Sequence, residues 1–195
     1  MVMGMGAGMF PLRVDEETEL ELVGLGHVDE LQQVIERNLD HLRPWMPWAR
    51  EPNTREGLAA FVDLSLRRLA EGNGFYAAIR HRGHIAGTVG LNIDQRDRVG
   101  EIGYWLDRDL QGRGLVTKSV AAVVERCFGE LSLHRVEIRC APENARSRAV
   151  PERLGFLEEG TVRDAERLGE GEYHDLVIYG RLATDPGELW PRSPQ

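Results

Sequence analysis

Apolar and polar positions along the chain follow two periods, which predict where strands and helices form. Alternation of polar and apolar residues over Thr18–Gly24 predicts a first strand, and apolar residues at helical spacing over His27–Leu42 predict a helix. Prolines break the helical pattern within Arg43–Asn53. A second helix is expected to follow an N-cap at Thr54 and to run to about Ala70.

The rest of the chain begins with strands and then alternates strands with helices. The expected elements are, in order, strands Gly74–Arg80, His84–Ile93 and Val99–Asp107, helix Leu115–Glu130, strand Arg135–Ala141, helix Ala145–Leu154, and strands Gly155–Arg163 and Glu172–Leu182, the last two around a charged turn. No internal repeat or linker interrupts this order. The pattern therefore predicts one α/β domain over residues 10–182, after a mobile leader at residues 1–9 and before a loose tail at residues 183–195.

Composition excludes several classes of protein. The net charge of −8 argues against nonspecific nucleic-acid binding, which depends on neutralising phosphates. The sequence has no run of about 20 apolar residues, and its start lacks the basic region and cleavage site of a secretory signal. We therefore expect a cytoplasmic protein with neither a nucleic-acid nor a membrane partner. Cys127 and Cys140 follow apolar patterns and should be buried small hydrophobes, and the sequence shows no metal-ligand spacing.

The most informative stretch is QGRGLVTKSV at Gln111–Val120, where two glycines lie between a predicted strand and a predicted helix. Glycine permits a sharp turn and a close approach of a ligand to the main chain. The free N–H groups and the positive dipole at a helix start can hold a pyrophosphate. A G-x-G loop alone is a weak signal, but a second motif, NARSRAVPERLGF at Asn144–Phe156, lies about one strand further on.

Four blocks of sequence, in a fixed order, carry a family resemblance. The blocks are NLDHLRPWMPW at Asn38–Trp48, EIGYWLDRDLQGRG at Glu101–Gly114, NARSRAVPERLGFLEEG at Asn144–Gly160 and YHDLVIYG at Tyr173–Gly180. They resemble the GCN5-related N-acetyltransferase (GNAT) superfamily, and within it the RimJ/RimL-type ribosomal-protein N-acetyltransferases, over most of the chain. The resemblance implies a mixed α/β sheet with helices on both faces, splayed open between its fourth and fifth strands. It also implies acetyl-CoA as the cosubstrate in that opening.

The resemblance further implies which residues hold acetyl-CoA. The pyrophosphate loop would consist of Gln111, Gly112, Arg113, Gly114, Leu115, Val116 and Thr117. The main chain at Trp105 and Leu106 would pair with the pantetheine arm, and Asn144 would hydrogen-bond it. Structural alternatives are core packing for the two apolar side chains, an exposed loop position for Arg113 and a simple helix cap for Asn144. Where this family often has glutamate after the glycines, the chain has Lys118, which we expect to face solvent.

Acetyl transfer to an amine needs a base for the amine, a donor for the carbonyl oxygen and a proton for the leaving thiolate. Glu101 is the candidate base, because it lies where several superfamily members carry their base; the alternatives are a carboxylate that only orients the substrate and a structural carboxylate paired with an arginine. By resemblance, Ser147 would hydrogen-bond the departing sulfur and deliver a proton; the alternative is a first-turn capping residue. Trp45 and Trp48 are expected either to line the acceptor side or to form a hydrophobic lid. His174 is expected only to pack or to bond a turn.

These residues predict an enzyme that transfers acetyl from acetyl-CoA to a primary amine by direct attack. No Ser–His–Asp nucleophile elbow is present, so we expect no acyl-enzyme. The resemblance suggests a protein N-terminus as acceptor, as in ribosomal proteins, and is compatible with a homodimer. The alternatives are a small-molecule amine acetyltransferase, acting on an amino acid, polyamine or amine antibiotic, and a noncatalytic acyl-CoA-binding module. A nucleotide triphosphatase is excluded because Leu115, not lysine, follows Gly114.

Overall fold

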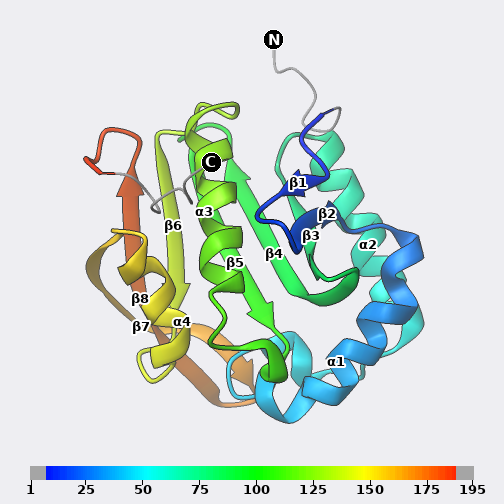
Figure 1. Cartoon of the computed structure of the whole chain (residues 1–195). Helices are drawn as coiled ribbons and strands as arrows, with labels where there is room; N and C mark the ends of the chain where they lie inside the picture. The colour runs from blue at the N-terminus through cyan, green and yellow to red at the C-terminus, as the bar shows by residue number, and fades with distance from the viewer. Residues whose placement is uncertain (1–7, 188–195) are drawn as a thin grey trace.

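The computed structural model describes residues 8–187, which are organised around one eight-stranded sheet (Figure 1). The strand order is β1-β2-β3-β4-β5-β6-β8-β7, and β5 and β6 are parallel whereas the other neighbours are antiparallel. The strands are β1 Leu12–Arg13, β2 Thr18–Leu22, β3 Gly74–His81, β4 His84–Asp94, β5 Val99–Leu106, β6 Arg135–Cys140, β7 Leu157–Gly169 and β8 Glu172–Leu182. This mixed sheet confirms the predicted α/β class.

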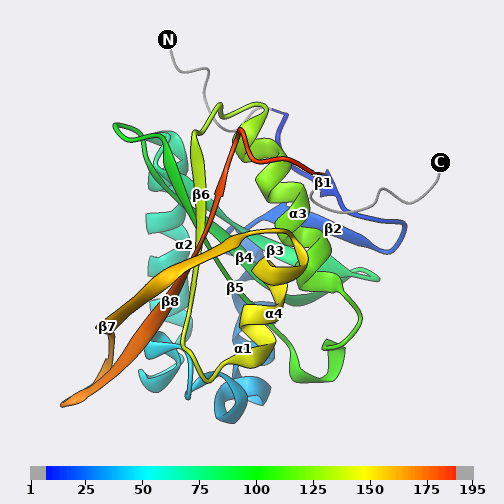
Figure 2. The same cartoon turned by 90° about the vertical axis from the view of Figure 1, so that its left-hand side faces the viewer.

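Helices cover both faces of the sheet. The α-helices of the described chain are α1 Val28–Leu42, α2 Arg55–Ala70, α3 Leu115–Phe128 and α4 Ala145–Arg153, with short 3-10 turns at Leu25–His27, Pro47–Arg50 and Arg108–Leu110. Figure 2 shows α3 and α4 on one side of the sheet and α2 on the other. One apolar core lies beneath α1 and α2 and includes Trp105; the other lies beneath α3 and α4 and includes Leu106.

Local sequence signals account for the first two helices. The helical apolar positions of α1, among them Val28, Leu31 and Ile35, are buried against the sheet. The hydroxyl of Thr54 accepts a hydrogen bond from the N–H of Gly57 at 3.0 Å, which confirms the predicted N-cap of α2. Among residues 8–187, no helix has both the length and the hydropathy that crossing a membrane requires.

The ends of the described chain are more ordered than the sequence suggests. The first seven residues of the predicted leader lie outside the described residues, but Met9 is buried in the core at 6% exposure and so belongs to the folded domain. In the predicted tail, the N–H of Ala183 donates to the carbonyl of His134 at 3.0 Å, and the carbonyl of Gly187 accepts from Arg181 at 2.7 Å. These polar contacts involve no apolar side chain, so the hydrophobic pattern of the sequence does not predict them.

The last hairpin departs most from the prediction. β7 continues to Gly169, so the segment after Arg163 that was expected to be a charged turn is a strand. Its pairing with β8 is interrupted by register shifts, and Glu166 lies opposite His174. Nearly all side chains of β7 are exposed, so no apolar alternation marks the strand. The far end of the hairpin lies on the same side of the sheet as α2 (Figure 2).

The parallel pair β5 and β6 separates part-way along its length. The two strands pair only at Val99–Glu101 and Arg135–Glu137, whereas β4 stays paired with β5 as far as Leu106. Beyond Glu101, no strand among residues 8–187 pairs with the edge of β5 that faces β6. Because the two strands are parallel, α3 and α4, which follow them, both begin near the divergent end. The opening expected between the predicted fourth and fifth strands is therefore present, between β5 and β6.

Candidate active site

The unpaired edge of β5 forms one wall of the opening. From Ile102 onward the residues of β5 pair with β4 only. The N–H of Asp107 donates to the Ala86 carbonyl, and alternate strand residues point their main-chain groups to the same edge, so the main chain of Trp105 bonds β4 and Leu106 has main-chain groups available to a ligand that pairs as a strand does. Both side chains are buried, each at 8% exposure, in the two separate cores. The core-packing alternative thus holds for both side chains, and of these two residues Leu106 presents its main chain to the opening.

The loop before α3 has the backbone that a phosphate cradle needs. Gly112 and Gly114 adopt positive φ angles of 75° and 73°, and a Cβ added at either position would meet no atom within 4 Å. Gly114 is the N-cap of α3 and supplies no side-chain cap to its first N–H groups. Leu115 and Thr117 are buried at 3% exposure and anchor the helix start, so these two residues can contribute only main-chain groups to a ligand.

Side chains hold this loop between two helices. The Gln111 amide lies 2.7 Å from Nε2 of His41 at the end of α1, and its oxygen accepts from Arg146 of α4 at 2.6 Å. Burial and the nearby Arg146 charge lower the pKa of His41. Arg113 is exposed and donates to the carbonyl of Asp109 at 3.4 Å. Side-chain contacts therefore hold the loop in place at Gln111, whereas the side chain of Arg113 is exposed to solvent.

Lys118 does not face solvent freely, contrary to the expectation. Its Nζ lies 2.8 Å from the Asp15 carboxylate, and its side chain is 35% exposed. The pair joins α3 to the segment between β1 and β2, which the hydrophobic pattern does not place beside α3. Lys118 thus has a structural partner in Asp15.

Replacing Gly112 with valine should weaken coenzyme A binding about 5- to 30-fold, because a positive φ costs a non-glycine residue roughly 1–2 kcal/mol and the added Cβ points into open space at the cradle. Titration calorimetry with coenzyme A measures this. Gly83→Val is the matched control: Gly83 has φ of 80°, equally open surroundings and a position in the β3–β4 turn. Equal affinity in both variants would remove the loop from the binding site.

Asn144 and Ser147 have different contacts at the start of α4. The side chain of Asn144 accepts from the N–H of Ser147 at 3.2 Å and is the N-cap of α4. The Ser147 hydroxyl instead lies 3.3 Å from the Tyr104 hydroxyl and 3.2 Å from the Cys140 sulfur. Asn144 therefore caps α4, and its predicted bond to pantetheine stays a prediction; within residues 8–187 the Ser147 hydroxyl makes no capping hydrogen bond.

Tyr104 and Cys140 were not predicted as site residues. Cys140 is buried, as expected, but its sulfur also contacts the Ser147 hydroxyl. Burial raises the pKa of the Tyr104 phenol and that of the Cys140 thiol, so both stay protonated at neutral pH. Only their positions in the sequence could have indicated these two residues, because Tyr104 lies on β5 and Cys140 at the end of β6, the two strands that diverge.

Glu101 lies at the point of divergence, on the face opposite Ser147. Alternate strand residues share a face, so Glu101 lies with Trp105 on the α1–α2 side. Its carboxylate is 43% exposed and 3.4 Å from Nε of Arg139. Arg139 also binds Glu137 at 2.9 Å. This is the arginine-paired arrangement that the sequence left open beside the role of base.

A second carboxylate, Glu166, approaches the same region from β7. It is half-buried, and among the described residues no hydrogen bond or ion pair holds it. Burial raises the pKa of Glu166, the nearby His174 opposes this shift and the charge of Glu101 adds to it. Nδ1 of His174 is buried without a hydrogen-bond partner in the described part of the chain. The sequence missed Glu166 because it lies in the segment expected to be a charged turn.

The proline-rich connector between α1 and α2 covers the α1–α2 side of the opening, the side on which Glu101 lies. The Trp45 ring lies 6.2 Å from the ring of His174, and Trp48 lies 6.1 Å from Trp105 and is 42% exposed. An ion pair between Arg50 and Glu172 ties the connector to the β7–β8 hairpin. The two tryptophans thus lie on the same side of the opening as the carboxylates, and their role at the acceptor stays a prediction.

Comparison with known proteins agrees with this geometry. The acetyltransferase (GNAT) domain family matches residues 19–157. The chain belongs to the GNAT acetyltransferase family. It is 36% identical to the putative ribosomal N-acetyltransferase YdaF of Bacillus subtilis, over 91% of this chain and 97% of that protein, and 31% identical to the ribosomal-protein-serine acetyltransferase of Escherichia coli, over 88% and 96%.

Solved GNAT structures have the same fold. The ribosomal-protein α-N-acetyltransferase RimL, solved with coenzyme A, superposes with a TM-score of 0.83 at 28% identity, covering 88% of this chain and 97% of that one. The microcin self-immunity acetyltransferase MccE, solved with acetyl-CoA and AMP, gives 0.84 at 27% identity, covering 92% and 98%. The chain is therefore an acetyl-CoA-dependent N-acetyltransferase.

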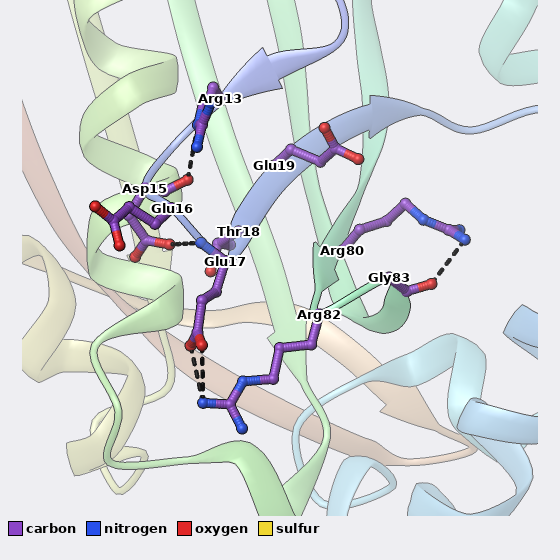
Figure 3. A pocket seen from close by; sticks show the side chains of 9 residues that line it. All are labelled: Arg13, Asp15, Glu16, Glu17, Thr18, Glu19, Arg80, Arg82 and Gly83. Carbon is purple, nitrogen blue, oxygen red and sulfur yellow. Dashed lines mark hydrogen bonds and ion pairs between the residues drawn. The ribbon is translucent and has the colours of Figure 1, made fainter.

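A hollow of about 370 Å³ lies elsewhere, beside β2 and the β3–β4 turn (Figure 3). Its charged groups largely satisfy one another: Arg82 binds Glu17 at 3.0 Å, and Arg80 donates to the carbonyl of Gly83 at 2.9 Å. None of its lining residues belongs to β5, β6, the glycine loop or α4. The hollow is therefore separate from the acetyl-transfer site.

Proposed function

We propose that this GNAT enzyme acetylates a protein N-terminal α-amine, with a ribosomal protein as the first class of acceptor to test. The observation that carries the proposal is the opening between β5 and β6, flanked by carboxylates on one face and by Ser147 on the other. Its relatives in Bacillus subtilis and Escherichia coli, which match nearly the whole chain, are named as ribosomal acetyltransferases and support this acceptor class.

In this mechanism the loop at Gly112 and Gly114 binds the pyrophosphate of acetyl-CoA, and the free edge of β5 pairs with the pantetheine arm. The amine enters from the α1–α2 side, beside Trp45. One main-chain N–H near Trp105 hydrogen-bonds the carbonyl oxygen as its charge grows. The new N–C bond forms while the C–S bond breaks, and Ser147 hydrogen-bonds the departing thiolate and relays to it a proton from water, so that the serine stays neutral.

The two carboxylates take different roles in this proposal. Glu166 receives the proton of the ammonium group, because it has no ion-pair partner among residues 8–187 and burial raises its pKa toward the working range of a general base. Glu101 orients the ammonium group, because Arg139 already balances its charge. This division follows the general pattern in which neighbouring carboxylates in unlike environments serve unlike functions.

A turnover assay against a panel of amines tests the proposed acceptor. Peptides with the free N-termini of ribosomal proteins should be acetylated with a higher kcat/KM than free amino acids, polyamines or amine antibiotics. The same peptides with blocked N-termini are the matched control and should be inert, even where they contain lysine. Preference for a small amine would replace the protein acceptor, and coenzyme A binding without turnover of any amine would indicate a noncatalytic module.

A further inference from the structure

The hydroxyl of Ser147 lies where both diverging strands reach α4. Tyr104 comes from the splayed part of β5, and Cys140 is the last residue of β6. The Tyr104 phenol donates to the main-chain carbonyl of Ser147 at 2.9 Å and accepts from the Ser147 hydroxyl at 3.3 Å. The Cys140 sulfur lies 3.2 Å from the same hydroxyl oxygen. The Ser147 hydroxyl thus contacts one side chain from each of the two diverging strands.

Tyr104 and Ser147 each have a single hydroxyl hydrogen to donate, which limits the hydrogen bonds they can form. The single phenolic hydrogen of Tyr104 is used by the Ser147 carbonyl, so the phenol can serve the Ser147 hydroxyl only as an acceptor. Ser147 also has one hydroxyl hydrogen, which it donates to the Tyr104 oxygen when no stronger acceptor is present. A thiolate is such an acceptor, because hydrogen bonds to charged groups are the stronger ones. When the hydroxyl turns to the thiolate, the Cys140 thiol can donate to the serine oxygen.

We propose that Tyr104 is a positioning residue for Ser147, holding the first turn of α4 and the serine hydroxyl toward the opening, with the Cys140 thiol as a supporting donor. This inference rests on the proposed role of Ser147 at the leaving sulfur. Neither Tyr104 nor Cys140 exchanges a proton with the substrate. Both act through the serine, and both stay neutral because burial raises their pKa values.

Tyr104→Phe should lower kcat about two- to twelvefold, the rate equivalent of one neutral hydrogen bond, and leave KM for acetyl-CoA within twofold of wild type. The shape of the pH–rate profile should not change, because Tyr104 does not titrate in the working range. Tyr179→Phe is the matched control. Its buried phenol contacts Arg148 and Glu152 of α4 but not Ser147, so it tests helix docking alone.

A double-mutant cycle with Ser147→Ala decides whether Tyr104 acts through the serine. We expect Tyr104→Phe to cost nothing further in kcat once the hydroxyl is absent. An equal loss in both backgrounds, or full kcat in Tyr104→Phe alone, would overturn the inference. If Ser147→Ala keeps full turnover, the role of Ser147 and the inference fail together. If no amine is acetylated by the wild type, the proposed function itself fails.

The supporting thiol has its own pair of variants. Cys140→Ala should lower kcat by a few-fold, and Cys140→Ser should restore it, since a hydroxyl can donate to the Ser147 oxygen in the same way. Thermal unfolding of both variants separates this effect from packing. Equal turnover in Cys140→Ala and wild type would remove the thiol from the proposal and leave Tyr104 to be judged by the cycle.

Discussion

Replacing Glu166 with glutamine should lower kcat by about 10²- to 10⁴-fold at neutral pH, the usual contribution of a general base. Burial raises the pKa of Glu166, so the wild-type rate should climb as pH rises through that carboxyl pKa. In the variant this limb disappears. The loss should shrink at high pH, because an α-amine with a pKa near 8 is then already neutral. A pH–rate profile with a saturating N-terminal peptide measures both effects.

Glu101→Gln is the decisive companion variant. Because Arg139 pairs with Glu101, we expect this change mainly to raise KM for the acceptor, with a smaller fall in kcat. Glu170→Gln, at an exposed carboxylate in the β7–β8 turn, is the matched control and should behave as wild type. If Glu101→Gln shows the large loss that recovers at high pH, and Glu166→Gln does not, the base is Glu101.

Replacing Ser147 with alanine should reduce kcat about 10- to 150-fold and leave acetyl-CoA affinity nearly unchanged. A hydrogen bond to a charged leaving group contributes roughly 1.5–3 kcal/mol, and it forms chiefly in the transition state. Steady-state kinetics together with calorimetry for acetyl-CoA separate the two quantities. The change should not remove the cap of α4, because Asn144 supplies it.

Two control variants complete that experiment. Ser65→Ala removes a buried helical hydroxyl of α2 that donates to the Phe61 carbonyl at 2.8 Å, away from the opening, and should leave kcat unchanged. Asn144→Ala should lower the free energy of unfolding by about 0.5–2 kcal/mol through loss of the cap. A Ser147→Ala protein with a lower Tm and full turnover would show that the serine is structural and that the thiolate takes its proton from another source.

Local sequence accounts for most of the fold. Periodicity, the Thr54 cap and the prolines after α1 predicted the main helices and strands close to their observed ends, because these signals act between residues near in sequence. The glycines of the motif likewise predicted the sharp turn before α3, and both Gly112 and Gly114 adopt positive φ, which is a local property. The short strand β1 and the second half of β7 escaped prediction. Main-chain pairing with a neighbouring strand forms them, and their side chains bear no apolar pattern.

The chemistry depends on contacts that no local pattern encodes. Through a family resemblance, the sequence singled out Glu101, Ser147 and the opening between two strands. Only the tertiary structure paired Glu101 with Arg139, brought Glu166 to the same side and set Tyr104 beside Ser147, 43 residues away. Strand register and the divergence of β5 from β6 decide such contacts. They depend on the packing of the whole sheet, so residue type and spacing alone do not reveal them.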